Sequence, residues 1–187
     1  MKIIKKIFSF SHEKKIAHKL YKTIVKQSRL PVFYTVCGVA DTFDGRFDMI
    51  SLHMILVIRR MKHDVDQTRK LSQELFDFMF EDFDLNLREL GIGDMGVLHR
   101  VKKMTKAFYG RLESYDRGLE NKKDEQLSAA LKRNLFRENE VSHANLLTIT
   151  KYVREQMDYL DTVSISNFLK GEIQFNPALI EEMNTKK

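Results

Sequence analysis

The sequence has very little cysteine. Its 187 residues contain one, Cys37, and a lone thiol cannot form an internal disulfide, so we expect a reducing compartment. Cys37 lies in the apolar run TVCGVA. A free cysteine in such surroundings packs as a small hydrophobic residue. We therefore expect Cys37 to have a packing role rather than to be a reactive thiol.

Proline and glycine are also scarce. The two prolines are Pro31 and Pro177, and there are eight glycines. Long stretches without these residues favour helices. A chain of this length buries about 70% of its unfolded surface, so it needs neither a disulfide nor a metal to fold. The sequence predicts an all-α, single-domain helical bundle of about six helices.

Long apolar runs are missing as well. The best run, residues 49–58, is interrupted by Ser51 and His53 and is followed by two arginines, whereas a membrane span needs about 20 apolar residues. The N-terminus lacks the apolar block of a signal peptide. It also has less Arg and Ser than a typical organelle transit peptide.

Apolar residues at three- and four-residue spacing outline the individual helices. Asp41 or Thr42 is expected to cap the helix that ends at about residue 62, and Ser142 is expected to cap the helix over 143–160. Gly91 is expected to end the third helix, which covers residues 66–90. Asp66 or Thr68 is expected to start that third helix. The predicted helices cover residues 13–29, about 42–62, 66–90, 94–119, 122–139, 143–160 and 163–170.

Three segments complete this division of the chain. Residues 1–29 are a basic N-terminal arm with the first helix, 30–180 form the helical domain, and 181–187 are a frayed tail. Within the domain, residues 32–40 are expected to be a buried extended segment or the start of a helix. Fraying is expected from Asn184 because chain ends are poorly tied down.

The positive charge is unevenly distributed. Residues 1–29 carry nine Lys or Arg and one acid, a net charge of +8, whereas the rest of the chain carries −2. This arm can be a solvated helix face, a contact with anionic lipid, or a contact with RNA phosphates. The lipid interpretation is favoured because bulky apolar residues accompany the charge. The residues expected to touch a membrane or RNA are Lys2, Lys5, Lys6, Lys14 and Lys15.

A catalytic or metal-binding pattern is not found. The sequence has no GxSxG or SxxK motif and no phosphate-binding glycine loop. Four carboxylates share one helix face, namely Glu74, Asp77, Glu81 and Asp84. A di-iron bundle needs two Glu-x-x-His pairs, and the one present, Glu140 with His143, falls at a helix boundary. We expect no cofactor and no metal. The acidic face is expected to be solvated or to meet the basic residues Arg100, Lys102, Lys103, Lys106 and Arg111. Alternatively, one of these two charged surfaces is a docking site for a charged partner.

Several ordered strings carry a family resemblance. They are VFY at 32–34, DTFDGRFD at 41–48, LH at 52–53, RR at 59–60, LSQELFD at 71–77, FEDFD at 80–84, LRELGIGD at 87–94, MTKAFYGR at 104–111 and YD at 115–116. In this order and spacing the chain resembles the ubiquinol–cytochrome c chaperone family over about residues 32–120, and more loosely as far as Phe175.

The resemblance implies an assembly chaperone without enzymatic activity. Members of that family assist assembly of the respiratory cytochrome bc1 complex. The resemblance implies that this chain binds newly made cytochrome b together with a small partner chaperone, as the mitochondrial members do. The chain resembles a bacterial-type member. A cytoplasmic position peripheral to the inner membrane is then expected, or the matrix side if the source is eukaryotic.

Polar, charged and aromatic residues inside the family strings are the expected partner contacts. They are Arg46, Phe47, His53, Arg59, Arg60, Arg88, Asp94, Tyr109 and Arg111. Gly110 departs from helix preference, since glycine costs about 1 kcal/mol in a helix interior. We expect that the missing side chain of Gly110 allows the backbone of a neighbouring segment to approach this helix closely.

Two other functions stay open at this stage. A ribosome- or RNA-associated adaptor would use the basic arm, and a metal protein would use the four carboxylates. The chaperone is the preferred hypothesis.

Overall fold

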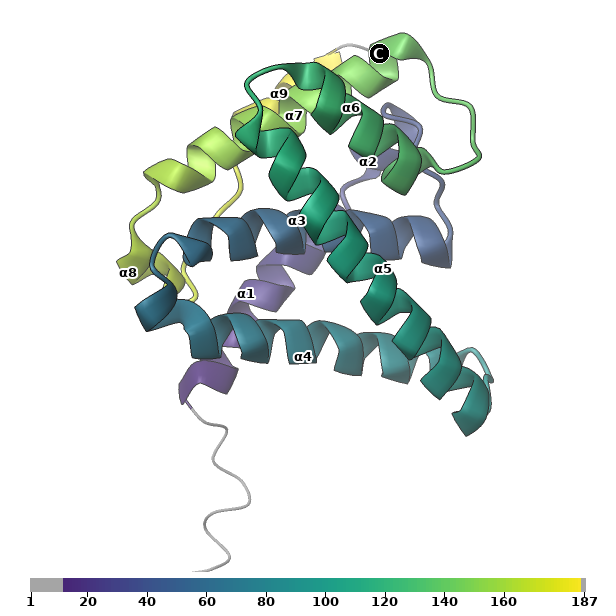
Figure 1. The fold of residues 1–187 in the computed structure, drawn as a ribbon, viewed down its shortest axis with the longest axis vertical. Helices are drawn as coiled ribbons and strands as arrows, with labels where there is room; N and C mark the ends of the chain where they lie inside the picture. Colours follow the sequence, from purple (N-terminus) through teal and green to yellow (C-terminus); the bar gives the residue numbers. More distant parts are fainter. Residues whose placement is uncertain (1–11, 186–187) are drawn as a thin grey trace, which may run out of the picture.

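The computed structural model describes residues 12–185, and in this part of the chain helices are joined by turns and loops, without a strand. Its elements are α1 (His12–Ser28), α2 (Pro31–Thr35), α3 (Phe43–Lys62), α4 (Val65–Glu89), α5 (Asp94–Glu120), α6 (Asp124–Leu131), the π-helical η2 (Lys132–Phe136), α7 (His143–Thr162), α8 (Ile165–Phe168) and α9 (Pro177–Thr185). Figure 1 shows the arrangement. The predicted all-α class is confirmed.

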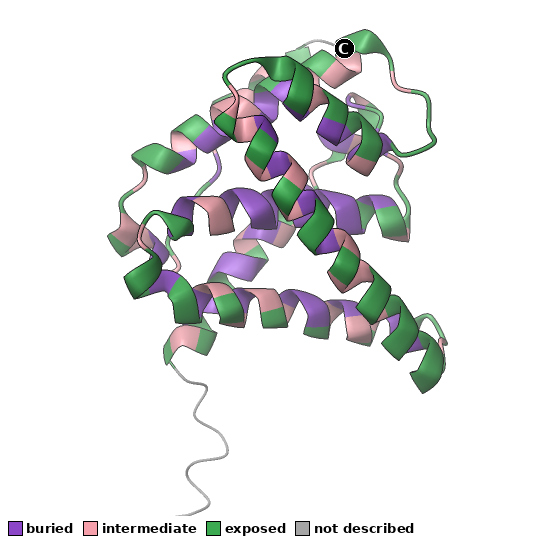
Figure 2. Cartoon of the chain, viewed as in Figure 1, coloured by how far each residue is buried: buried purple, intermediate pink, exposed green. Residues whose placement is uncertain are grey.

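Helix α3 lies at the centre of the molecule. All residues from 49 to 57 are buried, and α1, α4, α5 and α7 pack around them. A helix that is apolar on every side is stable only when neighbours enclose it. The longest apolar run of the sequence is therefore the core helix. Figure 2 shows the middle of α3 in the colour of buried residues, with more exposed residues at both ends.

Helices α1 and α4 pack on one side of this core. Ile16, Leu20 and Ile24 form the buried stripe of α1, and the hydroxyl of Tyr21 donates a hydrogen bond to Asp82 of α4 at 2.7 Å. Burial and the nearby Asp82 charge raise the pKa of Tyr21. This hydroxyl therefore stays protonated as a donor at neutral pH.

Helix α5 runs from a corner with α4 to the opposite end of the molecule, where α6 and α7 lie (Figure 1). The corner forms because Gly91 adopts φ +80°, which an L side chain rarely does. The amide of Gly91 donates to Arg88 O, and the amide of Ile92 donates to Leu87 O. These bonds satisfy the last carbonyls of α4, as predicted for Gly91.

The helix boundaries differ from the expectation in several places. Residues 31–35 are a short helix, and α4 begins at Val65, before both expected starting residues. The predicted helix 122–139 is split into α6 and η2, and the predicted helix 163–170 is reduced to Ile165–Phe168. The described residues thus hold more helices than the expected six or so, because short helical turns give weak periodicity.

The C-terminal segment also differs from the expectation. Helix α9 covers residues 177–185 and buries Met183. Asn184, where fraying was expected to begin, therefore lies inside this helix. Thr42 and Ser142 do cap α3 and α7: their side chains accept bonds from Gly45 N and Asn145 N, each at 3.1 Å. None of the helices in the described range has the length and hydropathy of a membrane span.

Candidate functional site

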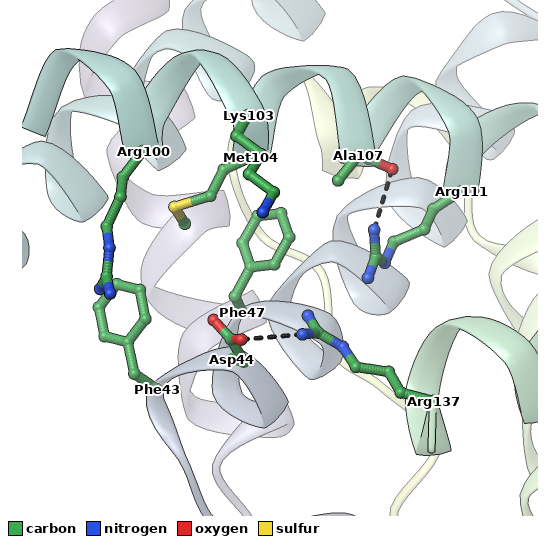
Figure 3. A pocket seen from close by; sticks show the side chains of 9 residues that line it. All are labelled: Phe43, Asp44, Phe47, Arg100, Lys103, Met104, Ala107, Arg111 and Arg137. Atoms are coloured by element: carbon green, nitrogen blue, oxygen red, sulfur yellow. Dashed lines mark hydrogen bonds and ion pairs between the residues drawn. The ribbon is translucent and has the colours of Figure 1, made fainter. Parts of the chain in front are cut away.

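Two hollows flank α5, and we name them the basic groove and the apolar groove. The basic groove lies between α5, the first turns of α3 and the residue after η2, and it has a volume of about 320 Å³. Figure 3 shows its lining side chains converging from these three elements. They are Phe43, Asp44, Phe47, Arg100, Lys103, Met104, Ala107, Arg111 and Arg137.

A completely buried carboxylate, Asp48, anchors two arginines of the basic groove. The guanidinium of Arg111 donates to Asp48 at 2.6 Å, and that of Arg137 donates to both carboxylate oxygens at 2.8 and 3.1 Å. Arg137 also binds Asp44 at 2.8 Å. Burial raises the pKa of Asp48, and the hydrogen bond from Arg137 and the charge of Arg111 oppose this rise.

The backbone of Arg137 contributes to this arrangement. Arg137 is the one non-glycine residue between 12 and 185 with a positive φ, 56°. Such a conformation is uncommon for a side chain of this size and persists where the surroundings hold it. Here the three hydrogen bonds to Asp44 and Asp48 hold it. The chain therefore turns sharply after η2 and directs a cation into the basic groove.

Two further cations of the basic groove are open. Within the described part of the chain, neither Arg100 nor Lys103 has a hydrogen bond or ion pair, and both are exposed. Arg111 and Arg137 pair with Asp44 and Asp48, so the formal charges of these four residues cancel. The uncompensated charge of the groove is therefore the positive charge of Arg100 and Lys103 on α5. Phe43, Phe47 and Met104 line the same groove with apolar side chains.

The apolar groove lies on the other side of α5, between that helix, the end of α3 and the first half of α4. Its volume is about 310 Å³. Phe76 forms its floor, with its ring centroid 5.5 Å from that of Phe108 and 5.5 Å from that of Tyr109. Tyr109 is 55% exposed and Val65 is 43% exposed. This groove therefore presents apolar and aromatic surface to solvent.

Cations line one rim of the apolar groove. Arg59 and Lys62 both pair with Asp116 of α5, the latter at 3.2 Å, and these pairs tie α3 to α5. Arg69 is exposed on the α4 side. An incoming segment that buries the aromatic floor would therefore meet positive charge at the edge.

Four of the predicted partner contacts lie in the interior instead. The structure places Phe47, His53, Arg60 and Arg111 among the buried residues. Phe47 packs edge-on against Phe83, and Arg60 binds Asp64 at 2.7 Å and the Val163 carbonyl at 3.0 Å. These side chains are enclosed in this conformation, although Phe47 and Arg111 also line the basic groove. Their contact with a partner stays a prediction.

His53 is the most completely enclosed of these four residues. Its Nδ1 lies 2.9 Å from Met49 O and its Nε2 lies 2.7 Å from the Tyr152 hydroxyl. The rings of Phe33 and Phe175 also enclose it. Burial lowers the pKa of His53 to about 4, while the Met49 carbonyl opposes this. The residue is a neutral, hydrogen-bonded core histidine.

The other predicted contacts lie on the surface but not in one place. Arg59 and Tyr109 meet at the apolar groove. Arg88 and Asp94 pair with each other at the α4–α5 corner, where Arg88 also binds Asp84 at 2.5 Å. Arg46 pairs with Asp41 at 2.7 Å before α3, and this contact lowers the pKa of Asp41.

Other expectations have mixed outcomes. Nothing in the described chain lies within 4 Å of a Cβ built on Gly110, so the expected close approach of a neighbouring backbone is wrong within this chain. Cys37 is buried, and burial raises its pKa to about 12, which fits a packing role.

Residues 12–185 contain no group of His, Cys, Asp or Glu suited to a metal ion.

Among residues 12–185, the acidic residues of α4 do not pair with the basic residues of α5 as one alternative had it. Glu74 pairs with Lys14 of α1 at 3.9 Å and Asp84 with Arg88 of its own helix. Of the basic arm, Lys14 and Lys15 are exposed on α1. Lys2, Lys5 and Lys6 lie outside the described residues, so their expected contact with a membrane or RNA stays a prediction.

Sequence reasoning missed the residues that shape both grooves. Asp48 and Arg137 are far apart in sequence and have no motif that joins them. Phe108 was expected only as a core position of its helix, and Phe76 was not assigned to a core. A partial signal existed, because α5 has five cations and no Asp or Glu between Met95 and Leu112, which is unusual for a helix that only needs to be solvated.

Comparisons with known proteins agree with this architecture. Residues 35–175 match the model of the family described as ubiquinol-cytochrome C chaperone. A solved structure titled the Cbp3 homolog from Brucella abortus has 36% sequence identity and a TM-score of 0.78, covering 88% of this chain and 91% of that one.

Curated relatives are eukaryotic and longer. Ubiquinol-cytochrome c reductase complex assembly factor 1 of Mus musculus is 29% identical over 167 residues, covering 89% of this chain and 56% of that protein. Protein CBP3, mitochondrial, of Saccharomyces cerevisiae is 27% identical over 162 residues, covering 83% of this chain and 48% of that protein. The chain thus spans about half the length of these two relatives. Because the family model covers most of the described helices, the chain belongs to the ubiquinol-cytochrome C chaperone family.

Proposed function

We propose that this chain is an assembly chaperone that binds cytochrome b, or its nascent form, during biogenesis of the respiratory cytochrome bc1 complex. The family membership and the assembly-factor names of the relatives support the process. The observation that carries the binding role is the apolar groove, with Tyr109 and Val65 exposed over an aromatic floor. Exposed aromatic surface of this kind is typical of protein-binding sites.

The groove suggests how the client would be held. Its floor rings pack on Phe80 and the rest of the core, so the surface is already formed before binding and little entropy is lost on contact. An apolar client segment would cover Phe76, Tyr109 and Leu112, while Arg69 would meet acidic or polar groups beside it. Such a contact is driven by buried apolar area and is reversible. Release would follow when the next assembly step covers the segment.

The partners and location follow as proposals. A small partner chaperone would share the client, and the basic groove is open for a second, acidic contact. Work at the membrane suits a client that is itself a membrane subunit. The protein would act on the cytoplasmic face of the inner membrane in a bacterium, or on the matrix side in a eukaryote.

The test is recovery of cytochrome b on tagged protein from detergent-solubilised cells. The wild-type chain should enrich cytochrome b without the mature complex. Tyr109→Asp places a charge in the apolar groove and should reduce recovery about tenfold or more, as expected for loss of a central aromatic contact. Leu147→Asp is the matched control, since Leu147 is 49% exposed on α7 and lines neither groove.

Equal recovery by Tyr109→Asp and wild type, with both folded by circular dichroism, would contradict the role of the groove. Absence of cytochrome b with ribosomal components recovered instead would favour the ribosome- or RNA-associated adaptor. That outcome should then depend on the basic arm and weaken steeply with salt.

A further inference from the structure

The corner between α4 and α5 exposes apolar side chains that the rest of the chain leaves uncovered. Met95 is 80% exposed, and Leu90 and Leu98 are each 64% exposed. The corner projects at one end of the molecule (Figure 1), and its ribbon is largely exposed (Figure 2). The grooves do not include these three residues, so neither the core nor the proposed client site accounts for them.

Cations continue the same face along α5. Met95, Leu98, Lys102 and Lys106 recur at three- and four-residue spacing, which places them on one side of the helix. The opposite side carries Val97 and Phe108, which are buried. Lys102 and Lys106 are exposed and have no ion pair among residues 12–185. The face is therefore apolar at its tip and basic behind it.

Negative charge near this face is limited. Asp94 and Asp84 are both paired with Arg88, and Glu89 is the remaining exposed carboxylate of the corner. No Asp or Glu occurs between Met95 and Leu112. A surface of this composition complements one that is negative outside and apolar just beneath, since each Lys near an anionic leaflet contributes and the apolar residues insert between headgroups.

We infer that the α4–α5 corner is a contact surface for an anionic lipid bilayer, with Leu90, Met95 and Leu98 inserted at headgroup level and Lys102 and Lys106 above the lipid phosphates. The apolar tip is what favours lipid over RNA, because phosphate contacts with RNA reward clustered cations but not exposed Met and Leu. The contact would place the chain on the membrane with both grooves beside it.

The test is sedimentation of the full chain with vesicles of phosphatidylcholine alone and of phosphatidylcholine mixed with phosphatidylglycerol. Wild type should bind the mixed vesicles and not the neutral ones. Lys102→Glu with Lys106→Glu should lower the partition coefficient about tenfold or more. The matched control is Lys122→Glu with Lys123→Glu, which makes the same charge change at two exposed residues beyond the other end of α5.

A second pair of variants separates lipid from other acidic partners. Met95→Ser with Leu98→Ser keeps every charge and should reduce binding to mixed vesicles about fivefold or more, as expected for loss of inserted apolar area. Leu147→Ser on α7 is its control and should bind as wild type. Circular dichroism and thermal unfolding check that all variants are folded.

Three outcomes would overturn the inference. Wild type that fails to bind mixed vesicles does so directly. Binding that neither variant pair changes would assign the contact to another part of the chain, such as the basic arm. Binding that the lysine variant loses and the Met95→Ser, Leu98→Ser variant keeps would mean a purely electrostatic surface. No cytochrome b is present in this assay, so its failure is independent of the client proposal.

Discussion

At the scale of single residues, Asp48 shows how the core accommodates charge. Its carboxylate is completely buried and binds Arg111 and Arg137. Removing one member of a buried ion pair leaves the other uncompensated, which costs about 3–5 kcal/mol. Arg111 also donates to the carbonyls of Ala107 and Asn134, and its guanidinium lies 5.4 Å from the Phe47 ring centroid. The stability of the basic groove therefore depends on Asp48.

Replacing Asp48 should be costly and replacing Asp44 should not. Asp48→Asn should lower the free energy of unfolding by about 3 kcal/mol or more because both arginines lose their buried partner. Asp44→Asn removes an exposed contact of the same Arg137 and should cost less than about 1 kcal/mol. Urea unfolding of both variants measures this difference. Equal losses would show that burial of the carboxylate does not matter.

His53 should make stability depend on pH. Its pKa is lowered to about 4 by burial, below the ordinary value of about 6.5 in the unfolded chain. Between these values the unfolded chain binds the proton and the folded chain does not. The contribution is therefore fully present above about pH 6.5 and is lost as the pH falls towards 4, at most roughly 3 kcal/mol.

The measurement is urea unfolding of wild type and His53→Gln at about pH 7 and about pH 5. Wild type should lose more stability than the variant on going to the lower pH. His63 is half-exposed near Asp161, and His63→Gln serves as the control that should follow wild type. An equal loss in His53→Gln and wild type would mean that other groups account for the pH dependence.

At the scale of elements, α5 carries two glycines with opposite surroundings. A Cβ on Gly118 would lie 2.8 Å from the Cα of Leu127 in α6, whereas a Cβ on Gly110 meets nothing within 4 Å in the described chain. Gly118 therefore permits the close packing of α5 on α6. Gly110 has no such role inside this chain, and its open position lies beside the exposed Tyr109 of the apolar groove.

The two glycines form a matched pair of variants. Gly110→Ala should stabilise the chain by up to about 1 kcal/mol because alanine is the better helix former. Gly118→Ala should destabilise it by about 1–3 kcal/mol because the added methyl must displace backbone of α6. Thermal unfolding of both variants gives the comparison. Stabilisation by both would mean that α6 moves away without cost.

Helices and their ends were the most predictable elements. Thr42, Ser142 and Gly91 act at α3, α7 and α4 as their sequence positions indicated, because capping needs only local chemistry. Local patterns failed for α9 and for the break between α6 and η2. Those elements are short, and their stability comes from what they pack against rather than from their own periodicity.

At the scale of the whole molecule, α9 ties the C-terminal segment to α7 and α2. Met183 is buried and Lys151 pairs with Glu182 at 2.7 Å. Ending the chain after Asn176 should lower the free energy of unfolding by about 2 kcal/mol, close to the burial of one Met side chain. Ending it after Thr185 is the control and should change little. Equal unfolding midpoints for both would show that α9 does not support the fold.

The sequence by itself determined the class of fold, most of the long helices and the family, since these follow from periodicity, scarce breakers and ordered strings. It also indicated the excess of cations on α5. Only the tertiary structure decided which side chains are buried and which stay exposed. It buried His53 and Arg60, joined Asp48 to Arg137 across 89 positions, and left Tyr109, Met95 and Leu98 exposed. The physical reason is that a residue type fixes what a side chain can bind, whereas its burial and neighbours depend on how distant helices pack.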